Sequence, residues 1–347
     1  MSAKQTSTSA TQGAVARGGR GFKLRELLSS HGMLSVLLLM VIVLAVTTKG
    51  LFLSPDNLIN VLRQISINAI IATGMTFVII TGGIDLSVGS IVALAGVVGA
   101  SIVKLQLGVN VWWLVIAATL VGALIGAVAG LANGFSITRF AVPPFVATLA
   151  MMTVARGLSF IYTGGRPVWG LPVEFNALGR GYVLERLIGP VFPVPVLIMA
   201  VVMIAAHIVL SKTTFGRYVY AIGGNREAAR LAGIDVRRVE LSVYMLSGLL
   251  SGLAGVMLAS RLASGQPNAG VMYELDAIAA TVVGGTSLTG GVGRISGTLI
   301  GALIIGVIRN GLNLAGVESY TQQVVLGTVI LGAVLLDQLR RKLQAKN

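Results

Sequence analysis

The chain has 347 residues, of which 55% are hydrophobic and only 11% are charged, and its formal net charge is +14. A soluble domain carries roughly 25% charged residues, so this composition excludes an ordinary soluble protein and predicts an all-α polytopic membrane protein. Cys is absent and His occurs twice, which excludes a disulfide framework and argues against a metal centre. The positive charges lie between apolar segments without interleaved aromatic residues, so nucleic-acid binding is also excluded.

Ten apolar segments are expected to form a transmembrane helical bundle, each near the roughly 20 residues that a helical span needs. A tail at residues 1–32, rich in Ser, Thr, Gly and Arg, precedes them and is expected to be disordered. The first segment is interpreted as a retained span, because no clear cleavage site follows it. The eighth is short, and the third begins beside a Gly-rich break. The approximate bounds are 33–52, 65–82, 86–104, 111–133, 143–163, 191–210, 241–262, 274–289, 295–315 and 321–338.

The distribution of Lys and Arg predicts the orientation of this domain, 33–338. Six of the 26 basic residues lie in the loop 211–240, and others gather in the N-terminal tail and in the C-terminal tail, 339–347. Cytoplasmic segments are enriched in Lys and Arg, so both termini and the loop 211–240 are predicted to be cytoplasmic. The longest connection on the opposite side is 164–190, which could receive a partner there.

The loop 211–240 is expected to contain a short helix. Asn225 can cap its N-terminus, and Glu227 then lies in the positive first turn. Ala228 and Ala229 favour a helix and permit a close approach by a partner, and Gly233 can end it in a left-handed conformation. So short a helix is not stable alone in water. The alternative is a solvated loop with one helical turn.

A second feature is the Gly-rich segment Thr81–Ser90, which interrupts the apolar pattern at membrane depth. Irregular backbone survives there only where protein buries it or where it lines a cavity. Asp85, Ser87 and Ser90 are therefore candidates for the wall or gate of a permeation path. The alternative is a tight turn in which Asp85 caps the following helix.

Four charged residues lie well inside the predicted membrane or at the start of the short eighth span: Arg156, Arg309, Glu274 and Asp276. Charges inside a membrane are costly and usually paired. We therefore expect Arg156 or Arg309 to pair with Glu274 or Asp276 near the outer end of a path, the alternative being a purely structural ion pair. Asn68 on the second span could contact a polar solute, although such residues more often join helices by hydrogen bonds.

The segment 284–294 is rich in glycine and precedes an apolar run, as a phosphate-binding loop does. It lacks the Gly-Lys-Ser/Thr ending of such a loop, and that ending occurs nowhere in the chain. It is therefore predicted to be a cytoplasmic turn. No nucleophile with a base and no nucleotide site is evident, so the chain is not expected to be an enzyme and any energy from ATP must come through another chain.

Several stretches between residues 33 and 338 together resemble the inner-membrane permease subunits of bacterial ABC importers for pentoses and related sugars. These stretches are GIDLSVGS at 83–90, GRY at 216–218 leading to GGN at 223–225, QP at 266–267, YELDAIAA at 273–280, GGTSL at 284–288, GRI at 293–295 and NGLN at 310–313. The resemblance is specific for the family and much less so for one sugar.

This resemblance implies a pathway formed by two permease subunits, with a homodimer expected. It also implies separate ATP-binding subunits, which would carry ATP and Mg²⁺, and a periplasmic sugar-binding protein that delivers ribose or another pentose. No cofactor is expected on this chain. The stretch from Gly224 to Ile234 would then be the helix that seats in the ATPase, with Gly224, Asn225, Glu227, Ala228, Ala229 and Gly233 as its carried-over positions.

Three alternatives remain open at this point. A related importer of branched-chain amino acids or nucleosides would share the fold, although the stretch from Gly83 to Ser87 favours a sugar. A secondary transporter would need a site for a coupling ion, and buried carboxylates are few. A channel would conduct without ATP and without a binding protein.

Overall fold

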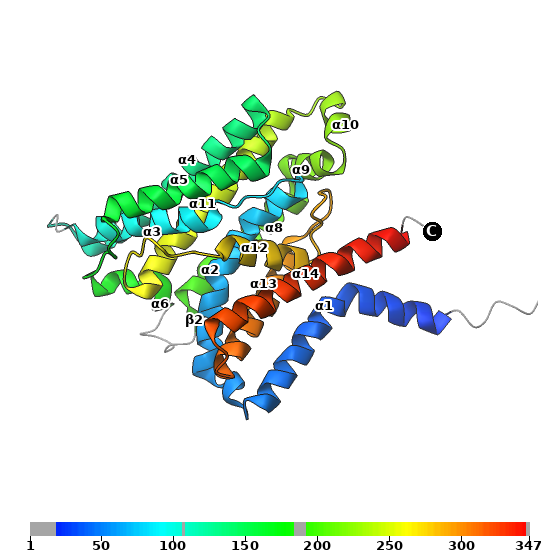
Figure 1. Cartoon of the computed structure of the whole chain (residues 1–347), viewed down its shortest axis with the longest axis horizontal. Helices are drawn as coiled ribbons and strands as arrows, with labels where there is room; N and C mark the ends of the chain where they lie inside the picture. Colours follow the sequence, from blue (N-terminus) through cyan, green and yellow to red (C-terminus); the bar gives the residue numbers. More distant parts are fainter. Residues whose placement is uncertain (1–18, 106–107, 184–191, 345–347) are drawn as a thin grey trace, which may run out of the picture.

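The computed structural model describes residues 19–105, 108–183 and 192–344, and its long elements are all helices (Figure 1). Residues 1–18 of the predicted tail, 1–32, lie outside the described residues. The rest of the tail belongs to α1, which begins at Gly19. Two short strands, β1 (Tyr182–Val183) in the connection 164–190 and β2 (Phe192–Pro193) just beyond it, pair antiparallel. The helices are α1 (Gly19–Thr47), η1 (Leu51–Leu53), α2 (Pro55–Ile80), α3 (Val88–Lys104), α4 (Val111–Phe140), α5 (Pro144–Thr163), η2 (Val173–Phe175), α6 (Asn176–Arg180), α8 (Val194–Lys212), α9 (Thr214–Gly224), α10 (Arg226–Leu231), α11 (Val236–Leu262), α12 (Tyr273–Val283), α13 (Ile295–Leu314) and α14 (Ser319–Gln344).

Six of the described helices are long and apolar enough to cross a membrane: α2, α4, α5, α8, α11 and α13. The prediction of an all-α polytopic membrane protein is therefore confirmed, whereas the count of ten full spans is not. The predicted eighth span, 274–289, corresponds to α12, which has 11 residues. At about 1.5 Å per residue it rises about 16 Å, roughly half of a hydrocarbon core about 30 Å thick. It ends early because Gly284 and Gly285 follow, the latter with a left-handed φ of 88°.

The central element of the bundle is α2 (Figure 1). It packs against α8, α11, α12 and α13, and between Ile65 and Ile80 only Asn68 is not fully buried. Its buried hydroxyl groups are hydrogen-bonded inside the bundle. The Thr76 hydroxyl, for example, lies 2.7 Å from that of Thr298 on α13. The apolar run that predicted this span is therefore a core helix, enclosed by other helices on most sides.

The helix pair with the most extensive contact is α4 with α11, and glycines allow its close packing. On α4 they recur every four residues, and a Cβ placed on Gly126 or Gly130 would clash with the backbone of α11. Gly248 and Gly252 stand in the same relation to the backbone of α4. Small residues at this spacing allow helices to pack closely in a bilayer. The high glycine content is thus partly explained by one interface, which fixes α11 against α4.

Candidate functional site

Two short helices, α9 and α10, project from one end of the bundle (Figure 1). They lie in the basic loop 211–240 and join α8 to α11. Thr213 caps α9, its hydroxyl accepting a hydrogen bond from Gly216 N at 3.3 Å. The buried residues Gly216, Val219 and Ile222 attach α9 to the bundle. This leaves α10 as the outermost ordered element of the described loop.

The two ends of α10 are fixed as the sequence predicts. The side chain of Asn225 accepts a hydrogen bond from Ala228 N at 2.9 Å, which satisfies one of the free donors of the first turn. Gly233 has a φ of 84°, and Ile234 N donates to Ala229 O at 3.1 Å. This is the hydrogen-bonded left-handed ending that glycine favours. The predicted short helix, its cap and its glycine end are confirmed.

The outer surface of α10 is available for a partner. Glu227 and Ala228 are exposed, and Leu231 is 76% exposed. Glu227 forms an ion pair with Arg230 one turn later, at 2.6 Å, and the Arg230 guanidinium lowers the pKa of this carboxyl. Ala229, in contrast, is 4% exposed and packs inward. Of the residues predicted to contact a partner, Glu227 and Ala228 therefore lie on the exposed face of α10, whereas Ala229 packs against the rest of the protein.

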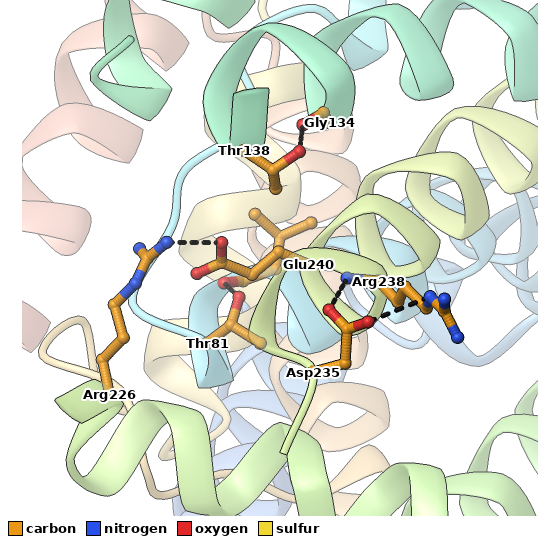
Figure 2. Close-up of polar contacts among 8 residues, drawn as sticks. Thr81, Gly134, Thr138, Arg226, Asp235, Arg238 and Glu240 are labelled. Atoms are coloured by element: carbon orange, nitrogen blue, oxygen red, sulfur yellow. Dashed lines mark hydrogen bonds and ion pairs between the residues drawn. The ribbon is translucent and has the colours of Figure 1, made fainter. Parts of the chain in front are cut away.

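A single ion pair connects α10 to a long apolar helix. The Arg226 guanidinium, at the start of α10, lies 2.8 Å from the Glu240 carboxylate of α11 (Figure 2). The side chain of Glu240 is only 6% exposed, whereas that of Arg226 is 59% exposed. Nearby, Asp235 caps α11 by accepting from Arg238 N at 3.1 Å. A displacement of α10 would thus act directly on a buried charge in α11.

Backbone contacts hold α9 against two other elements at this end. Gly223 approaches the carbonyl of Ile80, the last residue of α2, so closely that a Cβ there would clash. Gly291, in the turn between α12 and α13, donates to that same carbonyl at 2.9 Å. The Tyr220 hydroxyl donates to Gly293 O at 2.7 Å. The segment 284–294 is therefore a turn, as predicted, and it lies at the same end of the bundle as α10.

Two helices begin in the interior of the bundle instead of at its ends. The segment 81–87 has no helix of its own, and α3 starts after it. Gly255, past the midpoint of α11, packs against the backbone of Val92 in the first turns of α3. The segment 264–272 is likewise irregular, and α12 starts after it. A Cβ on Gly89 would clash with the carbonyl of Gly270, so the two helix starts meet.

Asp85 is the centre of a closed hydrogen-bond network in the first irregular segment. Its carboxylate is fully buried and accepts from Ser87 N at 3.0 Å and from the Ser87 hydroxyl at 2.5 Å. The Ser247 hydroxyl of α11 donates to its other oxygen at 2.9 Å. Asn133 of α4 donates to the Ser87 hydroxyl at 2.9 Å. Asp85 thus ties the start of α3 to α4 and α11.

Ser90 lies in the first turn of α3, beside the Asp85 network, and is not exposed to solvent. It is fully buried, and its hydroxyl donates to Ser87 O at 2.8 Å. The three residues proposed from sequence as a wall or gate therefore lie together, inside the packed bundle of a single chain. Asn68 lies apart from them on α2, half-buried.

The charged residues of the predicted spans form two separate arrangements. Arg309 of α13 pairs with Asp276 of α12 at 2.5 Å, one of the expected combinations. Arg156 of α5 instead donates to two backbone oxygens, Pro267 O at 2.9 Å and Ala269 O at 2.7 Å. Irregular backbone at membrane depth needs such donors. Arg156 therefore supports the second irregular segment, and Glu274, at the start of α12, lies against Gly89.

The Asp276–Arg309 pair borders a cavity of 330 Å³ between α12 and α14. Ser319, Gln322 and Gln323 add polar groups to its lining. One oxygen of Asp276 and the Nε atom of Arg309 are buried and have no hydrogen-bond partner among the described residues. No group of three or more His, Asp or Glu able to hold a metal ion occurs in the described part of the chain. The available chemistry is hydrogen bonding to polar uncharged groups.

Two residues of this site were missed from the sequence. Glu240 is the last residue of the predicted loop 211–240, where a charged side chain is ordinary, and its partner Arg226 is 14 positions earlier in the same loop. Ser247 is an unremarkable small residue in an apolar helix, although it bonds Asp85 over a separation of 162 residues. The weak signal for Glu240 was its position where the charged loop meets the apolar span 241–262, since charges at membrane depth are normally paired.

The comparisons with known proteins agree on one family. Residues 57–334 match the family described as branched-chain amino acid transport system / permease component. The ribose import permease protein RbsC of Bacillus subtilis (strain 168) is 53% identical over 87% of this chain and 90% of its own length. The protein of the same name from Escherichia coli (strain K12) is 49% identical over 92% and 97%. The L-arabinose transport system permease protein AraH of the same strain is 38% identical over 92% and 94%. No solved structure matches the chain.

Proposed function

The chain belongs to the family of branched-chain amino acid transport system / permease components, and on that premise we propose that it is the membrane-spanning permease subunit of an ATP-driven sugar importer in the bacterial inner membrane. Ribose or another pentose is the proposed substrate. The relatives at 53% and 49% identity are named ribose import permeases, and the arabinose permease is less similar at 38%.

The observation that carries the proposal is the geometry of α10. A partner that hydrolyses ATP needs a rigid contact on the permease, and α10 supplies one because Asn225 and Gly233 fix both of its ends. Its exposed face presents Glu227, Ala228 and Leu231. The small side chain of Ala228 and the apolar side chain of Leu231 suit insertion into a groove of a partner. We infer that Gly224, Asn225 and Gly233 shape this helix and that its exposed face contacts the ATPase.

The orientation follows from placing α10 in the cytosol. The interrupted segments are then read as crossings made of two parts, an irregular stretch followed by α3 or α12. Together with α1 and α14 they bring the crossings to ten, with both termini cytoplasmic. The support for this orientation is the concentration of basic residues in the loop 211–240, where six of the 26 occur.

The partners follow from the role. ATP-binding subunits, carrying ATP and Mg²⁺, dock on α10, and no cofactor resides on this chain. A periplasmic sugar-binding protein delivers the substrate on the opposite face, and a second copy of the permease completes the pathway. The support for these partners is the family membership together with the absence of any phosphate-binding Gly-Lys-Ser/Thr motif in the chain.

The mechanism starts from the Arg226–Glu240 ion pair. Closure of the ATPase pair displaces α10, and the buried Glu240 carboxylate transmits that displacement to α11. Because α11 also holds Asp85 through Ser247, the start of α3 moves with it. The contact between the starts of α3 and α12, at Gly89 and Gly270, is then the part of the protein that switches between two arrangements. In one the path is open to the periplasm, and in the other it is open to the cytosol. ATP and the loaded binding protein shift this equilibrium because each binds one arrangement better.

The proposed path passes the interrupted helices. Asp276, Arg309 and Glu274 border it near the start of α12, where hydroxyl groups of a sugar can satisfy the unpartnered polar atoms. Asp85, Ser87 and Ser90 do not line the path in this proposal; they hold the start of α3 in position from inside the bundle. Arg156 holds the irregular segment 264–272 in the same way. Asn68 is the proposed polar contact on α2.

The proposal is tested by reconstituting the chain with its ATPase and adding a sugar-loaded binding protein. We expect uptake of labelled ribose into proteoliposomes that requires ATP and the binding protein and is insensitive to ionophores. Uptake driven by a proton or sodium gradient without ATP would refute it and would make Asp85 and Glu274 candidates for ion binding. Uptake of leucine or a nucleoside in place of ribose would retain the mechanism and reassign the substrate.

A further inference from the structure

A pocket of 480 Å³ lies at the end of the bundle opposite α10, and three arginines line it. Arg63 comes from α2, Arg180 ends α6, and Arg261 is the last residue but one of α11. In Figure 1, α6 lies at the far end of the molecule from α9 and α10. Three helices that are distant in sequence therefore bring guanidinium groups to one place.

The hydrogen bonds in this pocket leave most of its donors unused. Arg63 donates to Arg180 O, Arg180 Nε donates to Arg261 O at 2.5 Å, and Arg261 donates weakly to Asn60 Oδ1 at 3.4 Å. Each guanidinium carries five N–H donors, and all of the acceptors are neutral. Arg63 Nε is buried without a partner among the described residues, and the guanidinium stacks on Tyr182, 4.6 Å from the ring centre.

No negative charge offsets these cations within the described part of the chain. The ten residues that line the pocket include no Asp and no Glu. None of the four ion pairs among the described residues involves Arg63, Arg180 or Arg261. Like charges held this close repel one another, and Arg on the outer face opposes the charge asymmetry that orients a membrane protein. Such an arrangement is favourable when an anionic group occupies the pocket.

The position of the pocket indicates what that group belongs to. Its inner part is formed by Gly270 and Tyr273, at the start of α12, where the two interrupted helices meet. A partner that fills the pocket from outside thus touches the element proposed to switch. An anionic lipid headgroup would explain the positive charge of the pocket, but it would not explain why the pocket reaches the start of α12.

We propose that the Arg63–Arg180–Arg261 pocket is the outer docking site for acidic side chains of the sugar-loaded binding protein. This inference rests on the proposed function and names the residues that receive one of its partners. Guanidinium groups bind carboxylates in a two-point geometry that gives both affinity and orientation. Seating a carboxylate here places the open side of the binding protein over the start of α12.

The test measures the affinity between the ATPase–permease complex in nanodiscs of zwitterionic lipid and the organism's own ribose-binding protein, loaded with ribose. Arg180 is the best residue to change, because it is exposed and ends a helix. We expect about tenfold weaker binding for Arg180→Gln, about hundredfold for Arg180→Glu, and a weaker dependence on salt. Arg261→Gln should weaken binding similarly. Arg166→Glu changes another exposed arginine of the same connection, outside the pocket; it is the matched control and should bind as wild type.

The outcomes separate this inference from the proposed function. If wild type binds and all pocket variants bind equally well, the docking site is wrong and the importer assignment stands. If the pocket variants lose tightly bound anionic lipid while the affinity for the binding protein is unchanged, the occupant is a lipid headgroup and the inference is overturned. If wild type neither binds the binding protein nor responds to it by faster ATP hydrolysis, both fail. Equal binding of the ATPase by all variants confirms that they are folded.

Discussion

Arg226 on α10 and Glu240 on α11 are joined by a 2.8 Å ion pair whose acidic member is almost completely buried. It is the only one of the ion pairs among the described residues that connects α10 to a long apolar helix. A buried carboxylate needs its partner, because removing one member of such a pair costs up to about 3–5 kcal/mol. The pair is therefore a mechanical link from the outermost helix into the bundle.

The first prediction concerns this pair. Arg226→Gln leaves the Glu240 carboxylate buried without a cation, so we expect a lower melting temperature and impaired coupling of ATP hydrolysis to uptake. Glu240→Gln removes the charge and keeps a hydrogen-bonding group, so its effect should be smaller. In the double variant most of the loss of stability should disappear, since no buried charge remains. Strictly additive losses in thermal unfolding of the purified complex would show that the two residues do not act together.

A second prediction concerns the end of α10. Gly233 has a φ of 84° and no atoms near the position of a Cβ, so backbone conformation alone limits substitution there. Gly233→Val should misplace α10 and reduce the amount of ATPase bound by at least tenfold. Gly233→Asn is the matched variant, because Asn tolerates the left-handed conformation, and it should retain binding. An equal loss of ATPase binding in both variants would mean that the added side chain at position 233, and not the backbone conformation, disturbs the contact with the partner.

The two interpretations of Asp85 can be separated by a third experiment. If Asp85 serves to cap α3, Asp85→Ala leaves Ser87 N and the Ser247 hydroxyl unsatisfied and costs about 2–3 kcal/mol of stability. Asp85→Asn keeps one acceptor oxygen and can donate to Ser247, so it should cost less and preserve uptake. An Asn variant that is folded and abundant in the membrane but inactive in ribose uptake would favour a direct role in the path.

The meeting of α3 and α12 gives a fourth prediction. A Cβ at Gly89 would clash with the carbonyl of Gly270 and with Glu274, whereas Gly157 on α5 has open space around it. Gly89→Ala should therefore abolish ATP-driven uptake, and Gly157→Ala should leave it unchanged. Uptake by Gly89→Ala at wild-type rate and abundance would argue that the two helix starts do not meet in the working protein.

Local features of this chain could be predicted from sequence, and long-range ones could not. The cap at Asn225 and the glycine end at Gly233 depend on residues within a few positions, so both were predicted correctly. The pairing of Arg309 with Asp276 was expected because a membrane forces charges to pair, although the choice between two arginines was open. The Asp85–Ser247 hydrogen bond and the arginine pocket depend on how distant helices pack. Of the ten predicted spans, six are long and apolar enough in the described helices to cross a membrane. The rest are not confirmed as full spans, because hydropathy cannot distinguish a half-length helix such as α12 from a full-length one.

The central claim is that this permease is driven by a separate ATPase that docks on α10, and purification of the tagged chain from native membranes tests it most directly. The account predicts that an ATP-binding protein copurifies with wild type and is lost when exposed Glu227 is changed to Arg, while Glu174→Arg on the opposite face retains it. Copurification of no ATPase with wild type, or undiminished copurification with Glu227→Arg, would contradict the account.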